Sequence, residues 1–313
     1  MSLQGYYHLD LCKVNHELPV SDISAVLPTV EAGVSSQPAT RQMAWPTLRA
    51  VSRHPALHKA LKMSGSLLGF LVLWEVCCRV FEIPEFILPS PTTTILTVFK
   101  KWDLFAKHSL ITFYETGAGF LMAVAFGVFI AAIIVVIPVL ADLIMPLLLI
   151  SQLVPKVAIA PILLIWFGYG LFPKIFIAFL IAFFPIVVNT AAGLASVERP
   201  MLDLARSLEA TRWQIFSKFR VPVALPEMFS GMKIAITLAV IGAIIGEFVG
   251  GSSGLGYLIL IANSELDTPL AFAALLLLSL GGIILYASVE LLERLVIPWN
   301  KSTQTEFRPV VGG

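Results

Sequence analysis

Long apolar stretches separated by short polar segments run through the chain from residue 64 onward. Each stretch is long enough, or nearly so, to cross about 30 Å of hydrocarbon as a helix. Prolines 146, 155 and 161 interrupt the third stretch, so we expect that span to be kinked or broken. The pattern predicts an all-α membrane protein with six spans, at 64–81, 109–136, 140–165, 172–195, 227–249 and 269–291.

The beginning of the chain differs, because it is rich in Ser, Pro, Thr and Val and has no sustained period. We expect residues 1–60 to form a disordered or loosely ordered cytoplasmic tail. No basic head followed by a short apolar run and a small-residue cleavage site is present, so this segment is not expected to be a secretory signal. Residues 61–298 are then the transmembrane domain, and 299–313 a short cytoplasmic tail.

Composition supports a membrane location. The hydrophobic fraction is 58 % and the charged fraction is 13 %. Soluble domains average about 45–50 % apolar and about 25 % charged residues, so lipid must solvate part of this apolar surface. Cys77 and Cys78 are adjacent inside an apolar stretch and give neither a disulfide framework nor metal-ligand spacing. We therefore expect this chain to bind no metal and no cofactor.

The distribution of Lys and Arg predicts the orientation. These residues gather at 41–62 before the first span, at 199–220 between the fourth and fifth, and at 294–308 after the sixth. With six spans the three segments fall on one side, which the positive-inside bias identifies as the cytoplasm. The 250–268 loop has no Lys or Arg, as an outside loop should. Three lysines at 100–107 oppose this model, and we interpret the 82–108 connection as an amphipathic helix along the outer surface.

The loop between the fourth and fifth spans, 197–226, has the pattern of a short amphipathic helix. Pro200 suits a first helical turn, and we expect Pro222 and Pro226 to end this helix and begin the next span. Such a helix docks into a groove on a partner or lies on the membrane surface, and the periodicity alone leaves both alternatives open. The apolar stripe consists of Leu204, Leu208, Ile215 and Phe219, with Arg206, Glu209 and Lys218 largely off it.

The same loop resembles the signature loop of ABC importer permeases, E-A-A, three residues, Gly, nine residues, then I-x-L-P. Asp203 takes the Glu position, while Leu204 replaces the first Ala. Glu209 stands where the family has a Gly that marks a bend, and we expect it to favour a straighter helix or to place a charge at the docking surface. The resemblance implies that the ATPase-coupling residues are Asp203, Ala205, Arg206, Glu209, Ala210, Thr211, Trp213 and Pro222, with Phe219 and Val221 completing the I-x-L-P match.

Further segments are similar to one branch of this family, the permeases for nitrate, sulfonate, taurine, bicarbonate and thiamine-pyrimidine. The similar segments are Leu88–Pro91, Pro155–Pro161, Ile165–Gly170, Gly246–Gly250 and Gly254–Tyr257. The resemblance covers about 64–298 and implies a type I importer permease. It also implies a homodimer in the bacterial inner membrane with both termini cytoplasmic, partnered by ABC ATPase subunits and an external solute-binding protein.

ATP chemistry is not expected in this chain itself. It has no G-x-x-x-x-G-K-[ST] stretch, so we expect a non-enzymatic subunit whose partners use ATP. Nucleic acid is not among the expected partners. The substrate expected from the branch is a small solute: nitrate, a sulfonate, bicarbonate, a pyrimidine or another small heterocycle.

Polar residues inside apolar spans are candidates for the substrate path, because burying them in a bilayer is costly. Gln152 and Lys156 lie four apart beside Pro155, and Asn189 follows Pro185 in the fourth span. Lys156 could attract an anion, whereas Glu247 could bind a cation, cap a loop amide or pair with a lysine. The structural alternatives are interhelix hydrogen bonds and side chains that extend to the interface.

Two other classes of membrane protein compete with the importer hypothesis. An intramembrane enzyme would need a nucleophile with a base, or metal ligands, inside the spans. His108 is the last histidine in the chain and sits at a span end, and no H-E-x-x-H is present. A secondary, ion-coupled transporter would leave the 197–226 loop unexplained and usually shows internal repeats, of which none is evident.

Overall fold

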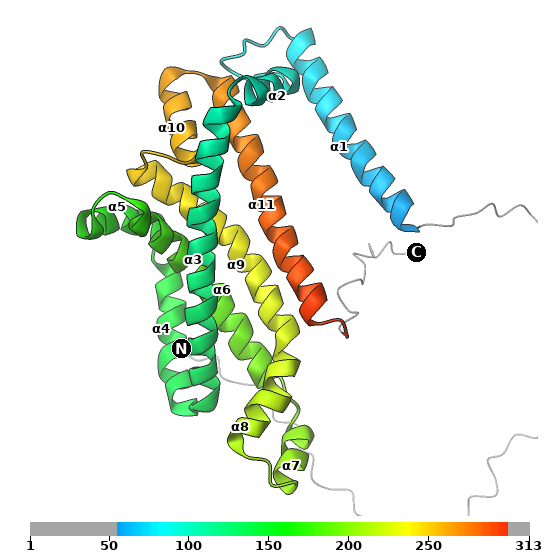
Figure 1. Cartoon of the computed structure of the whole chain (residues 1–313), viewed down its shortest axis with the longest axis vertical. Helices are drawn as coiled ribbons and strands as arrows, with labels where there is room; N and C mark the ends of the chain where they lie inside the picture. The colour runs from blue at the N-terminus through cyan, green and yellow to red at the C-terminus, as the bar shows by residue number, and fades with distance from the viewer. Residues whose placement is uncertain (1–54, 300–313) are drawn as a thin grey trace, which may run out of the picture. The chain divides into compact units, whose positions relative to one another are not determined.

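The computed structural model describes residues 55–299, and every regular element in that range is helical (Figure 1), which confirms the predicted all-α fold. The helices are α1 (Pro55–Val80), α2 (Pro91–Lys100), α3 (Trp102–Val136), α4 (Pro138–Leu153), α5 (Lys156–Phe167), α6 (Leu171–Ala195), α7 (Arg199–Ser207), α8 (Arg212–Ile215), a π-helical turn (Phe216–Arg220), α9 (Val221–Gly250), α10 (Leu255–Glu265) and α11 (Thr268–Val296). The tail predicted at 1–60 lies outside the described residues up to position 54, as does 300–313.

Four helical stretches within residues 55–299 are long and apolar enough to cross a membrane. They are α3, α6, the continuous run Arg212–Gly250 and α11. The pair α4 and α5 passes the same criterion jointly but bends by 93° between its two helices. α1 covers the predicted first span but is not among the four, so the described residues give four or five spans and leave the predicted six unconfirmed.

The break in the third predicted span lies at Val154 and Pro155. Val154 is extended, with φ −71° and ψ 123°. A residue before proline avoids the helical region because the proline ring crowds its backbone, so α4 ends there. The expectation of a broken third span is confirmed, and the break is at the second of its three prolines, whereas Pro146 and Pro161 remain inside helices.

Small residues bring α6 against both α3 and α9. A Cβ atom on Gly119 would lie only 2.6 Å from Ala178 Cβ, and one on Gly242 only 2.6 Å from Ala178 Cα. Glycine at these two positions lets three backbones converge on one alanine, which is how van der Waals packing joins helices in lipid. The core beside this point is also alanine-rich, with Ala123, Ala182, Ala235 and Ala239.

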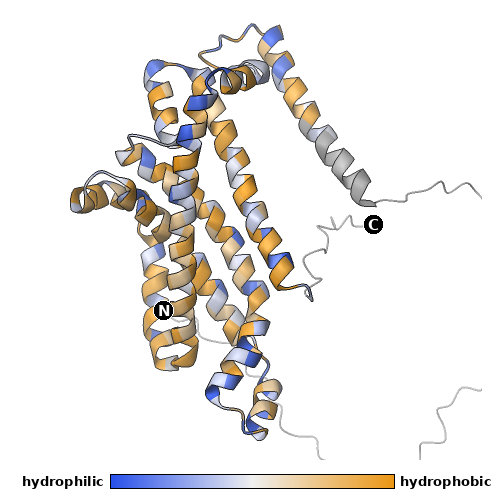
Figure 2. Ribbon diagram, in the orientation of Figure 1, coloured by the Kyte–Doolittle hydropathy of each residue, from blue (hydrophilic) through white to orange (hydrophobic). Residues whose placement is uncertain are grey.

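Large apolar side chains are exposed along most of the long helices, including α1, α4 and α11. Figure 2 shows that hydrophobic residues predominate along these helices and that α7 and α8 carry more hydrophilic residues. A soluble monomer does not expose apolar area on this scale, so lipid or partner subunits must cover it. The hydropathy of the fold therefore separates a membrane-embedded part from a hydrophilic protrusion formed by α7 and α8.

The 82–108 connection contains the expected short helix, α2, which is amphipathic. Ser90 caps its start by accepting from the Thr93 amide, and the helix buries Pro91, Thr94 and Val98. Lys101, one of the lysines that opposed the orientation, bonds Asp267 at 3.0 Å before α11. Glu75 and Arg79, four residues apart in α1, form an ion pair at 2.6 Å. The position of α2 relative to a membrane stays a prediction.

Candidate functional site

The 197–226 loop folds into two short helices, α7 and α8, which we call the coupling segment (Arg199–Ile215). Pro200 lies in the first turn of α7, as expected. α8 begins with a capping box, in which Thr211 Oγ1 accepts from the Gln214 amide and Gln214 Oε1 accepts from the Thr211 amide. The Thr-x-x-Gln spacing is a sequence signal for a second helix start, and it could have been recognised.

Glu209 forms the bend between the two helices. Its φ is +56°, in the left-handed region, although it is not glycine. The Glu209 amide donates to Arg206 O at 2.9 Å, and the Ala210 amide donates to Ala205 O at 3.0 Å. These two bonds are the Schellman pattern that usually ends on glycine. The expectation that Glu209 straightens the helix was wrong, because the paired bonds hold the bend against a conformational cost of about 1–2 kcal/mol.

The coupling segment continues into the next span without a stop. The stretch Arg212–Gly250 is one continuous 39-residue helical run, so the expected break at Pro222 and Pro226 is not there. The π-helical turn explains why, since the Val221 amide bonds Phe216 O, five residues back, just before Pro222. A wider turn changes the register where proline would otherwise break the i to i−4 pattern. α8 and α9 therefore belong to one continuous helical run.

The coupling segment exposes large apolar side chains among its charged and polar ones. Leu204, Leu208 and Trp213 are all largely exposed, with Trp213 at 73 %. Ala205, in contrast, is only 1 % exposed and faces the protein interior. Ala205 is therefore a packing position, whereas its bulkier neighbours are exposed, and the ATPase-coupling role of the segment stays a prediction.

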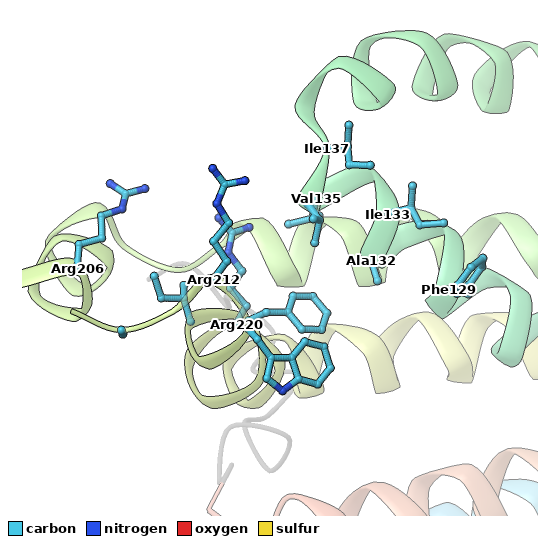
Figure 3. Close-up of a pocket in the computed structure, with 13 residues that line it drawn as sticks. Phe129, Ala132, Ile133, Val135, Ile137, Arg206, Arg212 and Arg220 are labelled. Carbon is cyan, nitrogen blue, oxygen red and sulfur yellow. The ribbon is translucent and has the colours of Figure 1, made fainter. Parts of the chain in front are cut away.

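A pocket of about 780 Å³ lies between the coupling segment and the C-terminal end of α3. Figure 3 shows Ile133, Val135 and Ile137 on the α3 side and the arginines on the other. Arg220 donates to Leu194 O at 3.3 Å, and Arg206 pairs with Asp203 at 3.0 Å. The pocket leaves space beside the coupling segment. Its full lining is Phe129, Ala132, Ile133, Val135, Val136, Ile137, Arg206, Ala210, Arg212, Trp213, Ile215, Phe216 and Arg220.

Three of the four path candidates keep a place compatible with a path. Gln152 is exposed near the end of α4, and Lys156 is half-buried as the first residue of α5, on the other side of the break. Asn189 Nδ2 donates to Pro185 O at 2.8 Å within α6, and its side chain packs beside Gly231 of α9. No hydrogen bond among residues 55–299 joins these side chains to one another, so their role stays a prediction.

The fourth candidate, Glu247, belongs to a buried polar cluster that we define as Glu115, Lys174 and Glu247. The three residues come from α3, α6 and α9 and are 0 %, 2 % and 0 % exposed. Lys174 Nζ lies 2.8 Å from Glu115 Oε1. Glu247 Oε1 accepts from Thr112 Oγ1 at 2.6 Å, and its Oε2 accepts from the Gly256 amide. Capping a loop amide was one of the three roles considered for Glu247.

The cluster holds the loop between α9 and α10. Lys174 donates to Ser253 O at 3.2 Å, and Thr112 Oγ1 accepts from the Leu255 amide at 2.8 Å. His108 Nδ1 accepts from the Gly254 amide at 2.9 Å. The sequence shows Glu115 and Lys174 as charges inside apolar spans, but their pairing across 59 positions had no signal in periodicity.

Comparison with known proteins identifies the class. Residues 123–298 match the model of the family described as "Binding-protein-dependent transport system inner membrane component". The chain is 37 % identical over 241 residues to a probable ABC transporter permease protein of Haemophilus influenzae, covering 77 % of this chain and 97 % of that protein. The chain belongs to the binding-protein-dependent ABC importer permease family, as the resemblance implied.

Other relatives carry named substrates. The chain is 37 % identical to the riboflavin transport system permease protein RibX of Chloroflexus aurantiacus, covering 83 % of this chain and all of that protein. It is 35 % identical to the formylaminopyrimidine transport permease protein ThiX of Halalkalibacterium halodurans, covering 78 % and 98 %. A chain of the inward-facing MetNI methionine ABC transporter shares the fold, with a TM-score of 0.55 at 18 % identity, covering 63 % of this chain and 98 % of that chain.

The protein is therefore a multi-pass membrane permease subunit of an ATP-driven importer. The family is a membrane component that works with ATPase and solute-binding partners, and its members are transport subunits. Of the two transport classes considered, the family match supports ATP-driven import over a secondary transporter.

Proposed function

We propose that the coupling segment is the docking element for an ABC ATPase on the cytoplasmic side of a bacterial plasma membrane. The observation that supports it most strongly is that three large apolar side chains, Leu204, Leu208 and Trp213, are exposed on an otherwise hydrophilic protrusion. Fully burying a Leu side chain stabilises an interface by about 1.5–3 kcal/mol. Tryptophan is enriched among the few residues that carry most binding energy. A groove on the ATPase that accepts this face is the natural partner.

The same segment explains how ATP binding reaches the membrane. α8 continues through the π-helical turn into α9, which packs along α6. If the ATPase pair binds the coupling segment differently before and after it closes, the difference in docking free energy biases the permease between inward- and outward-facing states. The chain itself binds no cofactor in this mechanism, and ATP is hydrolysed by the partner subunits.

A second copy of the chain completes the assembly in this proposal. One chain carries one coupling segment, and two-fold homodimers are the commonest symmetric assemblies. α4 supports the pairing because Leu147, Leu149, Ile150 and Leu153 are all exposed, more than a single lipid-facing stripe requires. Both termini are cytoplasmic in this arrangement, as the Lys and Arg distribution predicts.

The cargo is a small solute delivered by an external binding protein. The relatives' names indicate heterocycles such as formylaminopyrimidine and riboflavin, and the wider branch adds nitrate, sulfonates and bicarbonate. Gln152 and Lys156 flank the helix break, where backbone groups and an ammonium are available to a polar solute. Asn189 completes the proposed path residues, whereas Glu247 is bonded inside the buried cluster. A thermal-shift screen of the binding protein against these compounds tests the substrate class.

Substitution of the exposed face tests the docking proposal. Trp213→Glu and Leu208→Glu place a charge where an interface must be dry, so the ATPase should be lost from the complex purified after co-expression. Trp213→Phe keeps an aromatic ring there and should retain the ATPase. Circular dichroism and gel filtration confirm that the membrane domain stays folded. An ATPase that co-purifies at full stoichiometry with both folded Glu variants overturns the docking assignment, and it leaves a membrane-surface helix as the explanation.

A further inference from the structure

The buried cluster has an unbalanced charge count. It contains one lysine and two glutamates from three helices, all at most 2 % exposed. If all three were ionised, the cluster would carry a net charge of −1. An uncompensated charge in apolar surroundings is strongly unfavourable.

The hydrogen bonds around Glu115 are also incomplete. Lys174 occupies Oε1, but Oε2 is buried and has no hydrogen-bond partner among residues 55–299. Thr112, three residues before Glu115 on α3, donates to Glu247 Oε1 at 2.6 Å, so both carboxyl groups lie against the same turn of α3. Two ionised carboxylates are acceptors only, so a hydrogen bond between them requires a proton on one of them.

We propose that Glu115 and Glu247 bind one proton between them. The proton gives the orphaned Glu115 oxygen a partner and makes the cluster neutral, with one ammonium, one carboxylate and one carboxylic acid. The site is a single-proton binding site built from α3, α6 and α9. This protonation follows from the fold alone, and only its consequence for transport rests on the proposed function.

The neutral cluster positions the α9–α10 loop. Ser253, Gly254, Leu255 and Gly256 each hydrogen-bond the cluster or its neighbours Thr112 and His108. The loop is fitted closely, because a Cβ atom on Gly254, whose φ is +113°, would collide with the Glu247 carboxyl group. Loss of the proton would leave two adjacent carboxylates with one lysine, and their repulsion would loosen these four attachments.

Few other ionisable groups face the cluster. From α3, His108 contacts the loop through the Gly254 amide and Lys107 is exposed. From α10, Tyr257 stacks on His108 with ring centroids 6.1 Å apart. The first acidic residue of α10 is Glu265, at its last position. We therefore assign any pH dependence of the loop attachments to the Glu115–Glu247 pair. Substitution of His108 separates this contribution from that of the histidine.

Infrared absorption tests the proton directly. The purified full-length permease at neutral pH should show the carbonyl band of a protonated carboxylic acid that is absent from both Glu115→Gln and Glu247→Gln. Glu293→Gln is the control, because Glu293 is also buried, at 5 % exposed, but pairs one-to-one with Lys233 at 2.7 Å and needs no proton. The band should persist in His108→Gln as well. A spectrum in which neither cluster variant loses a band overturns the proposal.

Apparent melting temperatures of variants that differ in the number of buried charges give a second test. Glu247→Gln keeps Lys174 paired with Glu115, so its melting temperature should fall by no more than about 2 °C. The Glu115→Gln, Glu247→Gln double variant leaves a buried lysine unpaired and should fall by about 10 °C or fail to fold. Adding Lys174→Met to the double variant removes that charge and should recover the folded protein. If Glu247→Gln alone lowers the melting temperature as much as the double substitution does, the shared proton is contradicted. Neither readout depends on ATPase docking.

Discussion

Two ion pairs in this molecule have nearly the same geometry and different environments. Arg206 and Asp203 lie 3.0 Å apart in the coupling segment, with side chains 66 % and 68 % exposed. Lys174 and Glu115 lie 2.8 Å apart in the buried cluster, with side chains 3 % and 0 % exposed. Exposed pairs contribute about 0–1 kcal/mol, whereas removing one partner of a buried pair costs about 3–5 kcal/mol. Burial, more than distance, therefore decides how much each ion pair contributes to the stability of the fold.

The largest effect is expected from breaking the buried pair. Lys174→Met leaves Glu115 without its cation and should destabilise the membrane domain by about 3–5 kcal/mol. Arg206→Met, the matched change in the exposed pair, should stay below about 1 kcal/mol. Equilibrium unfolding of the two purified variants measures both. Equal losses would show that the environment does not distinguish the two pairs.

The next effect comes from two glycines on the same helix. Gly119→Ala adds a methyl group against Ala178 and should cost about 1–3 kcal/mol through overpacking. Gly117→Ala meets no atom within 4 Å and should stabilise α3 by about 0.5–1 kcal/mol, because alanine favours the helix. Opposite signs in thermal unfolding are expected. A loss of stability in both would mean that the close approach of α3 to α6 is not what selects glycine.

A smaller gain is expected at the bend of the coupling segment. Glu209→Gly removes the left-handed strain and should stabilise the segment by about 1 kcal/mol. ATP hydrolysis by the assembled complex should be preserved or increased. Ala210→Gly is the control, because Ala210 is not among the non-glycine residues of the described chain that have a left-handed backbone. Weaker ATPase binding in Glu209→Gly at low salt, where charge contacts are least screened, would instead indicate that Glu209 contacts the partner.

The sequence predicts well what depends on length and local chemistry. The apolar stretches at 172–195 and 269–291 correspond to α6 and α11, and Pro155 marks the α4–α5 break. α3 begins at Trp102, earlier than the predicted 109, because its first turns are polar and lie outside any apolar window. A hydropathy window does not detect the ends of helices where polar residues predominate.

The sequence does not predict what depends on tertiary contacts. Glu115 and Lys174 are neighbours only because α3 packs on α6, and no spacing along the chain records that contact. Glu209 has the helix preference of an ordinary residue, yet two backbone bonds hold it left-handed. Pro222 would be expected to end a helix, yet the run continues through it after a π-helical turn. The motif includes Ala205 among the expected coupling residues, and only the tertiary structure shows that this side chain is buried.

Site-specific photocrosslinking tests the central claim most directly. A photoreactive residue at Trp213, which is 73 % exposed, should crosslink to the ATPase in the purified complex. The same residue at Leu110, which is 72 % exposed near the other end of α3, is the matched control and should not. The account predicts a crosslinked permease–ATPase product from position 213 alone. An assembled complex that yields the product from position 110, or none from position 213, would contradict the coupling segment as the docking site.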